Sequence, residues 1–347
     1  MYKLKPHDYK KVLPLLKSEY QLSVFSVIHG IMQGKIFVNN LENPTAALIQ
    51  TSECNLLAGN VDDDTFESTI SDELGFWDSV IPDSEEWIRK IPPVHADHFV
   101  RQYTRCYYSL NQEDFIDTKK VLPQGFVVEQ VDLDFLRIKN FKYADEIIRS
   151  MEDWGGDKRF MYNGGGAYVR NEDEIISRSM WDCTYDDKVE IGIKTIKNKY
   201  RKMGFGIIAV AASIKACFER GYKTIGWHCV EANIGSRAIA SKLGFKLTGT
   251  YTAFTPYPPI ENPADLLETE WNEWAEYFEN SAKIEPRLWS ECLCAYIKAN
   301  NVAKANEILA IHKEKKPFEH NFNGIVRYLH SIGMATNFDD SWAENVK

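Results

Sequence analysis

The stretch from residue 189 to residue 230 constrains the fold more than any other part of the chain. Residues 189–193 alternate as a strand does, residues 205–219 form a long apolar helical segment, and Gly221 gives that helix a C-terminal stop signal. The run Thr224–Val230 then predicts a second strand. Because a strand, a helix and a strand in this order connect by a right-handed crossover, we expect the two strands to lie parallel in one sheet.

An antiparallel meander is expected just upstream in the same sheet. Residues 167–170 and 175–180 are strand-like and are separated by a polar turn at 171–174. A second polar turn, at residues 186–187, introduces the strand at 189–193. A meander that ends in one parallel crossover predicts a mixed, mostly antiparallel sheet in a protein of the α+β class.

Changes in hydrophobic periodicity and in proline content divide the 347 residues into three zones. The first, residues 1–120, combines helical periodicity with short β-like runs and a strand near residues 99–108, and nothing in it concentrates chemistry. The second, residues 121–256, contains the meander and the crossover. The third, residues 257–347, follows a proline-rich break at 256–259.

The third zone is expected to be a helical appendage. Its periodicity predicts helices over residues 266–278, 287–299, 302–313 and 322–332. The two helices on either side of Asn300 and Asn301 should form an antiparallel hairpin. A second copy of this hairpin is missing at the period that a repeat protein needs, which argues against a solenoid.

Composition excludes several classes of protein. A formal charge of −9 argues against a face built to hold a nucleic-acid backbone, so no nucleic-acid partner is expected. The N-terminus lacks the apolar segment of a signal peptide, and the apolar stretch 205–218 is too short to span a bilayer. We therefore expect a cytoplasmic protein with no membrane partner. Seven cysteines, an odd number, read as reduced thiols, and their spacing predicts no metal site.

The loop Arg201–Gly206 carries the first chemical signal. Its two glycines let backbone N–H groups converge, and the helix that begins there adds unpaired N–H groups and the positive end of its dipole. Five cations and no acid lie within the nine residues 194–202. These features predict a site for a multiply charged anion. On the loop alone, a solvated lysine-rich turn is an equally good interpretation, since the pattern is short and matches neither a nucleotide P-loop nor a dinucleotide fold.

A second block downstream decides between these interpretations. Asn233 is a natural helix N-cap, and Gly244-Phe245 ends the short helix that follows it. The order R-x-x-G-x-G, then N-x-x-S, then K-L-G-F about thirty residues after the loop resembles the GNAT superfamily of N-acetyltransferases over residues 124–255. More narrowly, residues 190–193, 227–229 and 240–245 resemble the branch that includes zwittermicin-type aminopolyol antibiotic resistance acetyltransferases.

The resemblance implies a fold and a cosubstrate, acetyl-CoA. Residues 121–256 would form the catalytic GNAT domain, and by analogy with tandem family members residues 1–120 would be a degenerate GNAT-like α/β domain without CoA. The edge near Gly192, a position compatible with a β-bulge, would pair with pantetheine. The residues implied in cofactor binding are Thr195, Ile196, Arg201, Lys202, Met203, Gly204, Phe205, Gly206, Asn233 and Ser236. Among them, the N–H groups of residues 203–206 would hold the pyrophosphate.

Glu190 is the candidate catalytic base. Apolar Val189 and Ile191 flank it, and it lies eleven residues before Arg201, where several members of the superfamily keep a glutamate base. The competing interpretation is a solvent-facing strand carboxylate. An N–H near Thr195 would stabilise the oxyanion.

The general acid departs from the family's pattern. Many members place a tyrosine four residues before the final Gly-Phe pair of residues, and here that position is Ala240. Tyr251, Cys229, Ser241 or water remain as alternatives. His228 is interpreted as a core or groove histidine rather than a catalytic one.

The sequence as a whole predicts an acetyl-CoA-dependent N-acetyltransferase. Transfer would be direct, in a ternary complex, to a primary amine on a small molecule, such as a small cationic amine or an aminopolyol, since the net charge is acidic. Two alternatives stay open: a catalytically idle CoA-binding or protein-interaction module, and a protein-modifying acetyltransferase. A homodimer is also left open, and no metal is expected.

Overall fold

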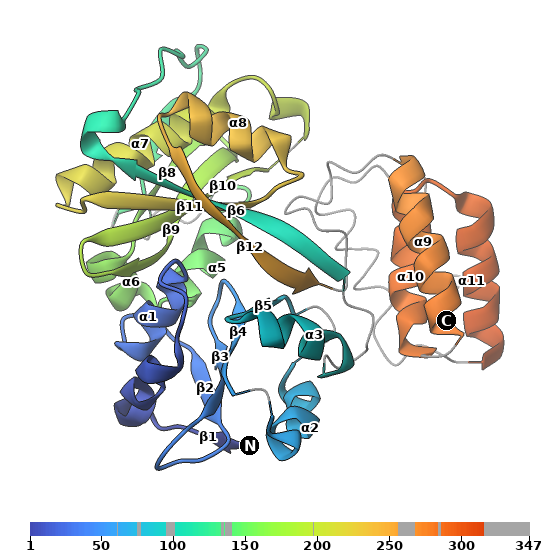
Figure 1. The fold of residues 1–347 in the computed structure, drawn as a ribbon. Coiled ribbons are helices and arrows are strands. Elements are labelled where there is room, and N and C mark those ends of the chain that lie inside the picture. The colour runs from blue at the N-terminus through green and yellow to red at the C-terminus, as the bar shows by residue number, and fades with distance from the viewer. Residues whose placement is uncertain are drawn as a thin grey trace. The chain divides into compact units, whose positions relative to one another are not determined.

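A computed structural model describes residues 1–60, 62–74, 78–94, 101–132, 135, 141–196, 198–255, 268–283 and 286–315 (Figure 1). The chain divides into two compact units, Met1–Glu261 and Asn262–Lys347. The predicted helix at 322–332 and the proline-rich break at 256–259 lie outside the described residues. The predicted boundary near residue 120 falls inside the first unit and stays a prediction.

The described strands of the first unit form one mixed sheet of twelve, in the order β1-β2-β3-β4-β5-β12-β6-β11-β10-β9-β8-β7. Neighbouring strands are antiparallel except for the parallel pairs β4–β5 and β10–β11, which confirms a mixed, mostly antiparallel sheet. The strands are β1 Tyr2–Lys3, β2 Lys35–Val38, β3 Ala46–Gln50, β4 Asn55–Gly59, β5 Val80–Pro82, β6 Arg101–Asn111, β7 Val127–Gln130, β8 Gly166–Arg170, β9 Ile175–Tyr185, β10 Lys188–Thr195, β11 Thr224–Val230 and β12 Lys246–Thr255.

The sheet has two halves of similar order, β1 to β5 inward from one edge and β7 to β11 inward from the other. The last strand of each half, β6 or β12, lies next to the opposite half at the centre of the sheet. In the first half, parallel β4 and β5 are followed along the chain by β6, and in the second half parallel β10 and β11 are followed by β12. Yet β6 pairs with β11 of the second half, and β12 pairs with β5 of the first. The two central strands also pair with each other along most of their length. Each half therefore completes the sheet of the other.

The crossover predicted from residues 189–230 is confirmed. Helix α7, Phe205–Glu219, connects β10 to β11, and the two strands run parallel. The apolar helix packs on β8, β9 and β10, and Trp181 of β9 donates its indole N–H to the Ser213 hydroxyl of α7 at 3.2 Å. Figure 1 shows α7 on one side of these strands and α1 and α5 on the other, so this part of the sheet is buried on both faces.

The remaining described helices of the first unit are short. They are the 3-10 segments η1 Pro6–Leu15, η2 Gln112–Asp114 and η3 Asn198–Tyr200 and the helices α1 Leu22–Ile28, α2 Asp64–Glu73, α3 Glu85–Val94, α5 Asp145–Glu152, α6 Asp157–Asn163 and α8 Ile234–Lys242. The opening helical segment is 3-10 rather than α-helical and contains Pro14, which removes a backbone donor inside it.

The described residues of the second unit are mostly helical, as predicted. Helices α9 Glu268–Ala282, α10 Trp289–Lys298 and α11 Val302–Lys315 begin and end within four residues of the ends expected for the first three helices of the third zone. A short 3-10 turn, η5 Pro286–Leu288, precedes α10. Asn300 adopts a positive φ of 56° between α10 and α11, a conformation that asparagine tolerates better than most residues. This turn closes the expected hairpin.

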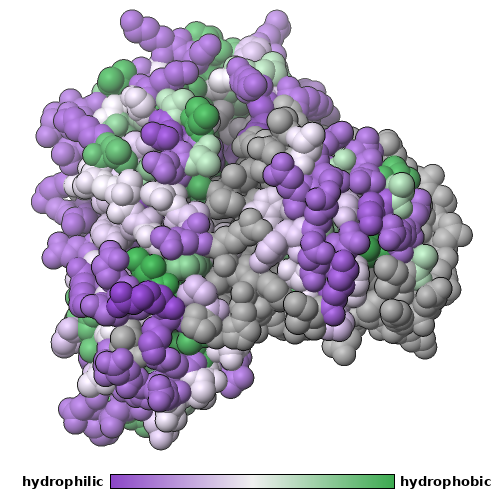
Figure 2. Space-filling model, turned by 45° about the vertical axis from the view of Figure 1, so that its right-hand side comes forward, coloured by the Kyte–Doolittle hydropathy of each residue, from purple (hydrophilic) through white to green (hydrophobic). Residues whose placement is uncertain are grey.

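The described helices include none that is long and apolar enough to cross a membrane. On the coloured part of the face drawn in Figure 2, hydrophilic side chains dominate and the apolar ones lie scattered among them.

Candidate active site

The site is built where β10 and β11 separate. The two parallel strands pair only from Lys188 to Glu190 with Thr224 to Gly226, although β10 continues to Thr195 and β11 to Val230. The register of β10 on its other neighbour, β9, shifts between Glu190 and Ile191. This irregularity lies close to Gly192, where the sequence is compatible with a bulge. Beyond Glu190, the side of β10 that faces β11 is therefore an open strand edge.

The backbone direction along this edge follows from one hydrogen bond. The N–H of Ile196 donates to the carbonyl of Ile176, at 2.9 Å, and so points toward the β9 side. Along an antiparallel pair of strands, residues whose N–H and C=O groups bond to the partner strand alternate with residues whose N–H and C=O groups point away from it. The N–H groups of Thr195 and Ile193 therefore point into the gap. Among the predicted pantetheine partners, Thr195 has its N–H on the open edge, whereas the N–H of Ile196 is already bound within the sheet.

The predicted CoA loop begins helix α7 with a left-handed turn. Gly204 is the N-cap residue and has a φ of 94°, a value that side chains rarely allow. Gly206, in the first turn, packs so closely on β10 that an added Cβ would lie 2.7 Å from Cδ1 of Ile193. The N–H groups of this first turn have no preceding helical carbonyl to bind, so they remain available to an anion.

The side chains of the loop divide into two kinds. Met203 is half exposed and Lys202 is exposed, whereas Phe205 is buried and stacks against Phe126, with ring centroids 4.7 Å apart. Arg201 is half-buried, and burial lowers the pKa of its guanidinium. Only the backbone of Phe205 is therefore placed to meet a ligand, while its side chain anchors the loop.

Two of the five cations that precede or begin this loop in the sequence lie close to acidic side chains in the structure. Lys194 is bound by Glu146 of α5, with Nζ 2.9 Å from Oε1, and Lys199 lies 3.9 Å from a carboxylate oxygen of Glu174. Lys197 lies outside the described residues. Lys120, which is distant from the loop in the sequence, adds another cation because its side chain passes beside Gly204. The lack of acids within residues 194–202 therefore overstates the positive charge of this segment, because acids from other segments pack against it.

The Lys194–Glu146 pair gives a pH-dependent contribution to stability. Burial would raise the pKa of Glu146, but the hydrogen bonds from Lys194 and the nearby guanidinium of Arg178 hold it below its ordinary value. A carboxylate with a lowered folded-state pKa stabilises above its unfolded-state pKa, and the contribution is lost as the pH falls through the folded value.

We therefore expect Lys194→Met to lower the free energy of unfolding by about 2 kcal/mol at pH 7, because it leaves a mostly buried carboxylate without its ammonium partner. The deficit should shrink as the pH falls toward 3, because the pKa of Glu146 is lowered while Lys194 is present and protonation of the carboxylate removes the ion pair. Urea unfolding at the two pH values measures it, with Lys35→Met, an exposed lysine of β2, as the control. An equal deficit at both pH values would contradict the assignment.

The two remaining predicted cofactor residues have structural partners. Asn233 caps α8 by accepting the N–H of Ser236 at 3.0 Å, which confirms its predicted capping role. Ser236 is buried, and its hydroxyl accepts the indole N–H of Trp227 at 2.9 Å. Ser236 lines the cavity described below, so its hydroxyl joins α8 to the wall of the site.

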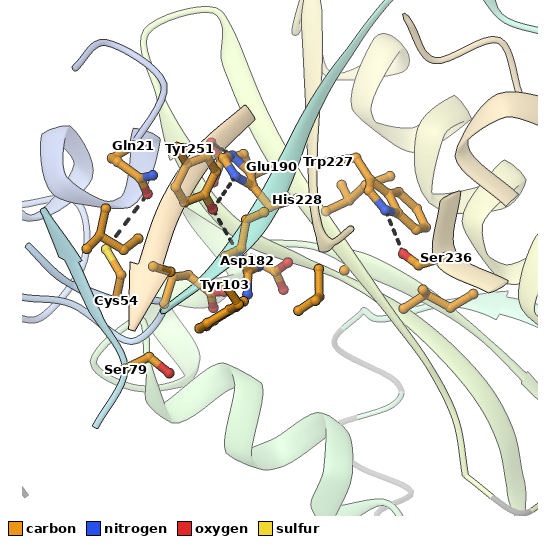
Figure 3. A pocket seen from close by; sticks show the side chains of 18 residues that line it. Gln21, Cys54, Ser79, Tyr103, Asp182, Glu190, Trp227, His228, Ser236 and Tyr251 are labelled. Atoms are coloured by element: carbon orange, nitrogen blue, oxygen red, sulfur yellow. Dashed lines mark hydrogen bonds and ion pairs between the residues drawn. The ribbon is translucent and has the colours of Figure 1, made fainter. Parts of the chain in front are cut away.

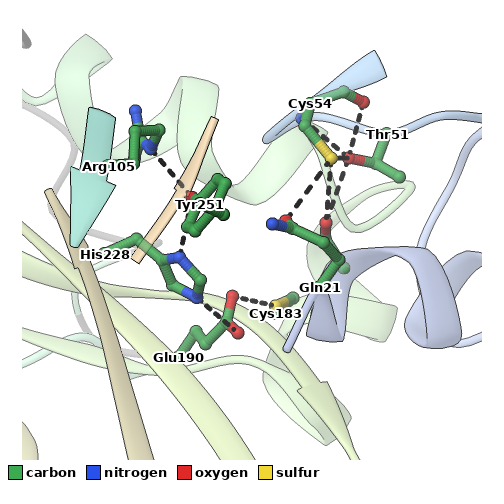
Figure 4. Close-up of polar contacts among 9 residues, drawn as sticks. Gln21, Thr51, Cys54, Arg105, Cys183, Glu190, His228 and Tyr251 are labelled. Carbon is green, nitrogen blue, oxygen red and sulfur yellow. Dashed lines mark hydrogen bonds and ion pairs between the residues drawn. The ribbon is translucent and has the colours of Figure 1, made fainter. Parts of the chain in front are cut away.

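Glu190 is a buried carboxylate rather than a solvent-facing one, with 8% of its surface exposed. Its partner across the parallel pair is Gly226, where an added Cβ would lie 2.7 Å from Cγ of Glu190. A glycine at this position therefore makes room for the glutamate side chain. The carboxylate is held from two sides: Oε1 lies 3.0 Å from Nε2 of His228, and Oε2 accepts a hydrogen bond from the Cys183 thiol at 3.2 Å (Figure 4).

His228 belongs to a chain of hydrogen bonds that the sequence interpretation missed. Its Nδ1 lies 2.8 Å from the hydroxyl of Tyr251 on β12, which also accepts a hydrogen bond from Nε of Arg105 on β6 at 2.9 Å (Figure 4). Because arginine only donates, the Tyr251 proton is left to bind Nδ1, and a neutral imidazole then carries its proton on Nε2 and donates it to Glu190. The hydrogen bonds are therefore all donated in the same direction, from Arg105 through Tyr251 and His228 to Glu190.

Two tyrosines of this site have raised pKa values. Tyr107 of β6 lies against the imidazole of His228, with ring centroids 4.7 Å apart, and burial beside Glu190 raises the pKa of its phenol to about 12. Burial also raises the pKa of Tyr251, against the opposing effect of Arg105. Both phenols therefore keep their protons at neutral pH.

A cavity of about 240 Å³ opens beside the chain, and both halves of the sheet line it (Figure 3). The second half contributes Glu190, His228 and Tyr251, together with Asp182 of β9. The first half contributes Gln21, Glu53, Cys54, Ser79, Ile81, Tyr103 and Arg105. The expectation that the first zone concentrates no chemistry is therefore wrong, because strand exchange brings β6 into the centre of the site.

The cavity separates the candidates for the general acid. Tyr251 lines it, whereas Cys229 and Ser241 do not appear among its lining residues. Cys229 is fully buried in the core, and Ser241 is exposed on α8. Among the described residues, no cluster of three histidine, cysteine or acidic side chains is arranged to hold a metal ion.

Comparison with known proteins places the chain in a family. A sequence model of the GNAT acetyltransferase family matches residues 13–254. The chain is 24% identical to YdfB, an uncharacterized N-acetyltransferase of Bacillus subtilis strain 168, over 67% of this chain and 88% of the relative. The fold is similar to that of a GCN5-related N-acetyltransferase-like protein from Streptococcus suis, with a TM-score of 0.57 and 21% identity, over 72% of this chain and 98% of that one. The match over more than two hundred residues shows that the chain belongs to the GNAT acetyltransferase family.

Proposed function

We propose that this acetyltransferase transfers the acetyl group of acetyl-CoA directly to the primary amine of a small cationic acceptor. One observation carries the proposal: a buried carboxylate, Glu190, lies where β10 and β11 separate and faces a cavity that Glu53 and Asp182 also line. That position brings a base, an open strand edge and space for a small molecule together.

The edge and the loop support binding of the cosubstrate. The N–H groups at the start of α7, with Arg201, Lys202 and Lys120 nearby, suit the CoA pyrophosphate. The outward N–H groups of Ile193 and Thr195 suit an extended chain of amides, as an added strand would pair. Ile196, Asn233 and Ser236 then border this path, with roles that are structural as well.

The chemistry requires one proton to leave and another to arrive. The neutral amine attacks the thioester carbonyl, a new C–N bond forms, and the C–S bond breaks as the tetrahedral intermediate collapses. Glu190 takes the proton from the amine nitrogen, and His228 positions the carboxylate. Tyr251, whose hydroxyl proton binds His228 Nδ1 before the reaction, transfers that proton to the departing thiolate, and the Arg105 guanidinium beside it stabilises the resulting phenolate. Exchange with solvent restores both groups.

The charge of the cavity supports a cationic acceptor. Among the described residues that line it, three are carboxylates, Glu53, Asp182 and Glu190, and one is a guanidinium, Arg105. A cavity of about 240 Å³ also suits a small molecule more than a polypeptide side chain with its backbone. The resemblance of residues 190–193, 227–229 and 240–245 to aminopolyol resistance enzymes points to the same class.

Release of free CoA tests the proposal. We expect the full chain with acetyl-CoA to release thiol with 1,3-diaminopropane, spermidine or 1,3-diaminopropan-2-ol, and much more slowly with neutral or anionic amines such as glycine. Mass spectrometry of the product should show a single N-acetyl group. Binding of CoA in calorimetry without thiol release from any amine would instead favour an idle CoA-binding module, and acetylation of peptides alone would favour a protein-modifying enzyme.

A further inference from the structure

The amide of Gln21 is an unusual feature of the cavity wall. Gln21 immediately precedes α1, is 5% exposed and lines the cavity. Its Oε1 accepts a hydrogen bond from the Cys54 thiol, whereas among the described residues its buried Nε2 lies beside the Tyr251 hydroxyl, whose pKa it lowers, but makes no hydrogen bond of normal geometry. In Figure 4 the amide nitrogen lies on the side of Tyr251. Burying an amide donor without a partner is unfavourable, so such a group points to a ligand that satisfies it.

The orientation of this amide is fixed by its neighbours. The Cys54 thiol lies between Gln21 and a small network in which the Thr51 hydroxyl contacts both the carbonyl and the sulfur of Cys54. Burial raises the pKa of Cys54 to about 11, so the sulfur keeps its proton and remains a donor to Oε1. With the oxygen held by the thiol, the NH₂ group is directed toward the cavity.

We propose that Gln21 is a specificity-determining residue, whose Nε2 donates a hydrogen bond to a hydroxyl or carbonyl oxygen of the amine acceptor. An amide NH₂ only donates, so its partner on the ligand must be an acceptor atom and not an ammonium group. The carboxylates of Glu53 and Asp182 in the same cavity attract the ammonium groups of the ligand. The acceptor that fits both is an amine that also carries an oxygen.

This inference rests on the proposed function, and it assigns a role to the half of the protein that has no CoA loop. Gln21, Glu53 and Cys54 all come from the first half, whereas the base and the CoA loop come from the second. The first half would then select the acceptor while the second half carries the cosubstrate and the chemistry.

The test compares two diamines that differ by one hydroxyl group. Calorimetry on the full chain loaded with CoA would measure the binding of 1,3-diaminopropan-2-ol and of 1,3-diaminopropane. We expect the wild-type protein to bind the hydroxylated diamine about tenfold more tightly, as one hydrogen bond to an otherwise unpaired buried donor provides. In Gln21→Leu the two diamines should bind equally, with CoA affinity unchanged.

Two further variants keep the test decisive. Gln21→Glu preserves the size of the side chain and the oxygen that binds Cys54 but removes the NH₂ donor, so it should also lose the preference even if the leucine variant is poorly folded. Gln50→Leu is the matched control, because the Gln50 amide already donates to the Glu73 carbonyl and lies outside the cavity lining. That variant should keep the wild-type ratio.

Each outcome separates this inference from the proposed function. A tenfold preference that survives both Gln21 substitutions, or wild-type protein that binds neither diamine, would overturn the role of Gln21. Binding with a Gln21-dependent preference but without thiol release in a parallel assay would overturn the proposed reaction and support the role of Gln21.

Discussion

Replacing Gly204 with glutamate is expected to weaken CoA binding by at least about 100-fold. The residue has a φ of 94° at the N-cap of α7, so a side chain there strains the turn that aligns the first N–H groups of the helix. The new carboxylate would also repel the pyrophosphate at the point where the helix favours an anion. Calorimetric titration with CoA measures the effect.

The control for this variant is at the other end of the same helix. Gly221 also has a positive φ, 89°, and follows the C-terminal end of α7, with no atom within 4 Å of an added Cβ. Gly221→Glu therefore introduces the same residue in the same backbone conformation, away from the loop. We expect it to keep its CoA affinity even if both variants melt at a lower temperature. Equal loss of CoA affinity in the two variants would show that strain in α7 and not the loop is responsible.

Glu190→Gln should reduce kcat by roughly 100- to 10,000-fold while CoA affinity stays the same. Glutamine keeps the shape and accepts the His228 N–H, but it cannot take a proton from the amine. Because the carboxylate is 8% exposed, bulk water is poorly placed to replace it. Steady-state thiol release with saturating amine, together with CoA calorimetry, separates the two effects.

The pH profile gives this variant a second readout. If Glu190 is the base, the residual rate of the glutamine variant should rise with pH as free neutral amine becomes more abundant. Glu129→Gln is a suitable control, since Glu129 is paired with Arg170 on β7 and β8 and is not part of the cavity. An unchanged kcat in Glu190→Gln would remove Glu190 from the mechanism.

The local parts of the fold could be predicted from the sequence. The order of strand, helix and strand between residues 189 and 230 follows from periodicity and stop signals over short spans, and the structure confirms it. Asn233 is recognisable as a cap because the capping interaction reaches only three residues along the chain. Glu190 was also selected from its neighbours, and its burial depends on Gly226, which lies 36 residues away but directly opposite.

The parts that failed depend on contacts between distant segments. No local pattern indicates that β6 lies between β11 and β12, so Arg105 could not be assigned to the site from periodicity. His228 is satisfied and lines the cavity, as a groove histidine should, but its two polar partners could not be named because they come from different strands. The five cations before the loop were counted without Glu146, because that acid is brought to Lys194 only by packing of α5 on the sheet.

The exchange of β6 and β12 has a consequence for how this protein folds and evolves. A polypeptide that contained only the second half would lack the strand between β11 and β12, and its sheet would expose unpaired backbone at the very place where the reaction is proposed. Neither half is therefore a self-sufficient folding unit, and the pairing of β6 with β12 must wait for residues about 145 positions apart in the chain to meet. Because each half supplies a central strand to the sheet of the other, neither half can be lost without exposing an unpaired edge in the half that remains.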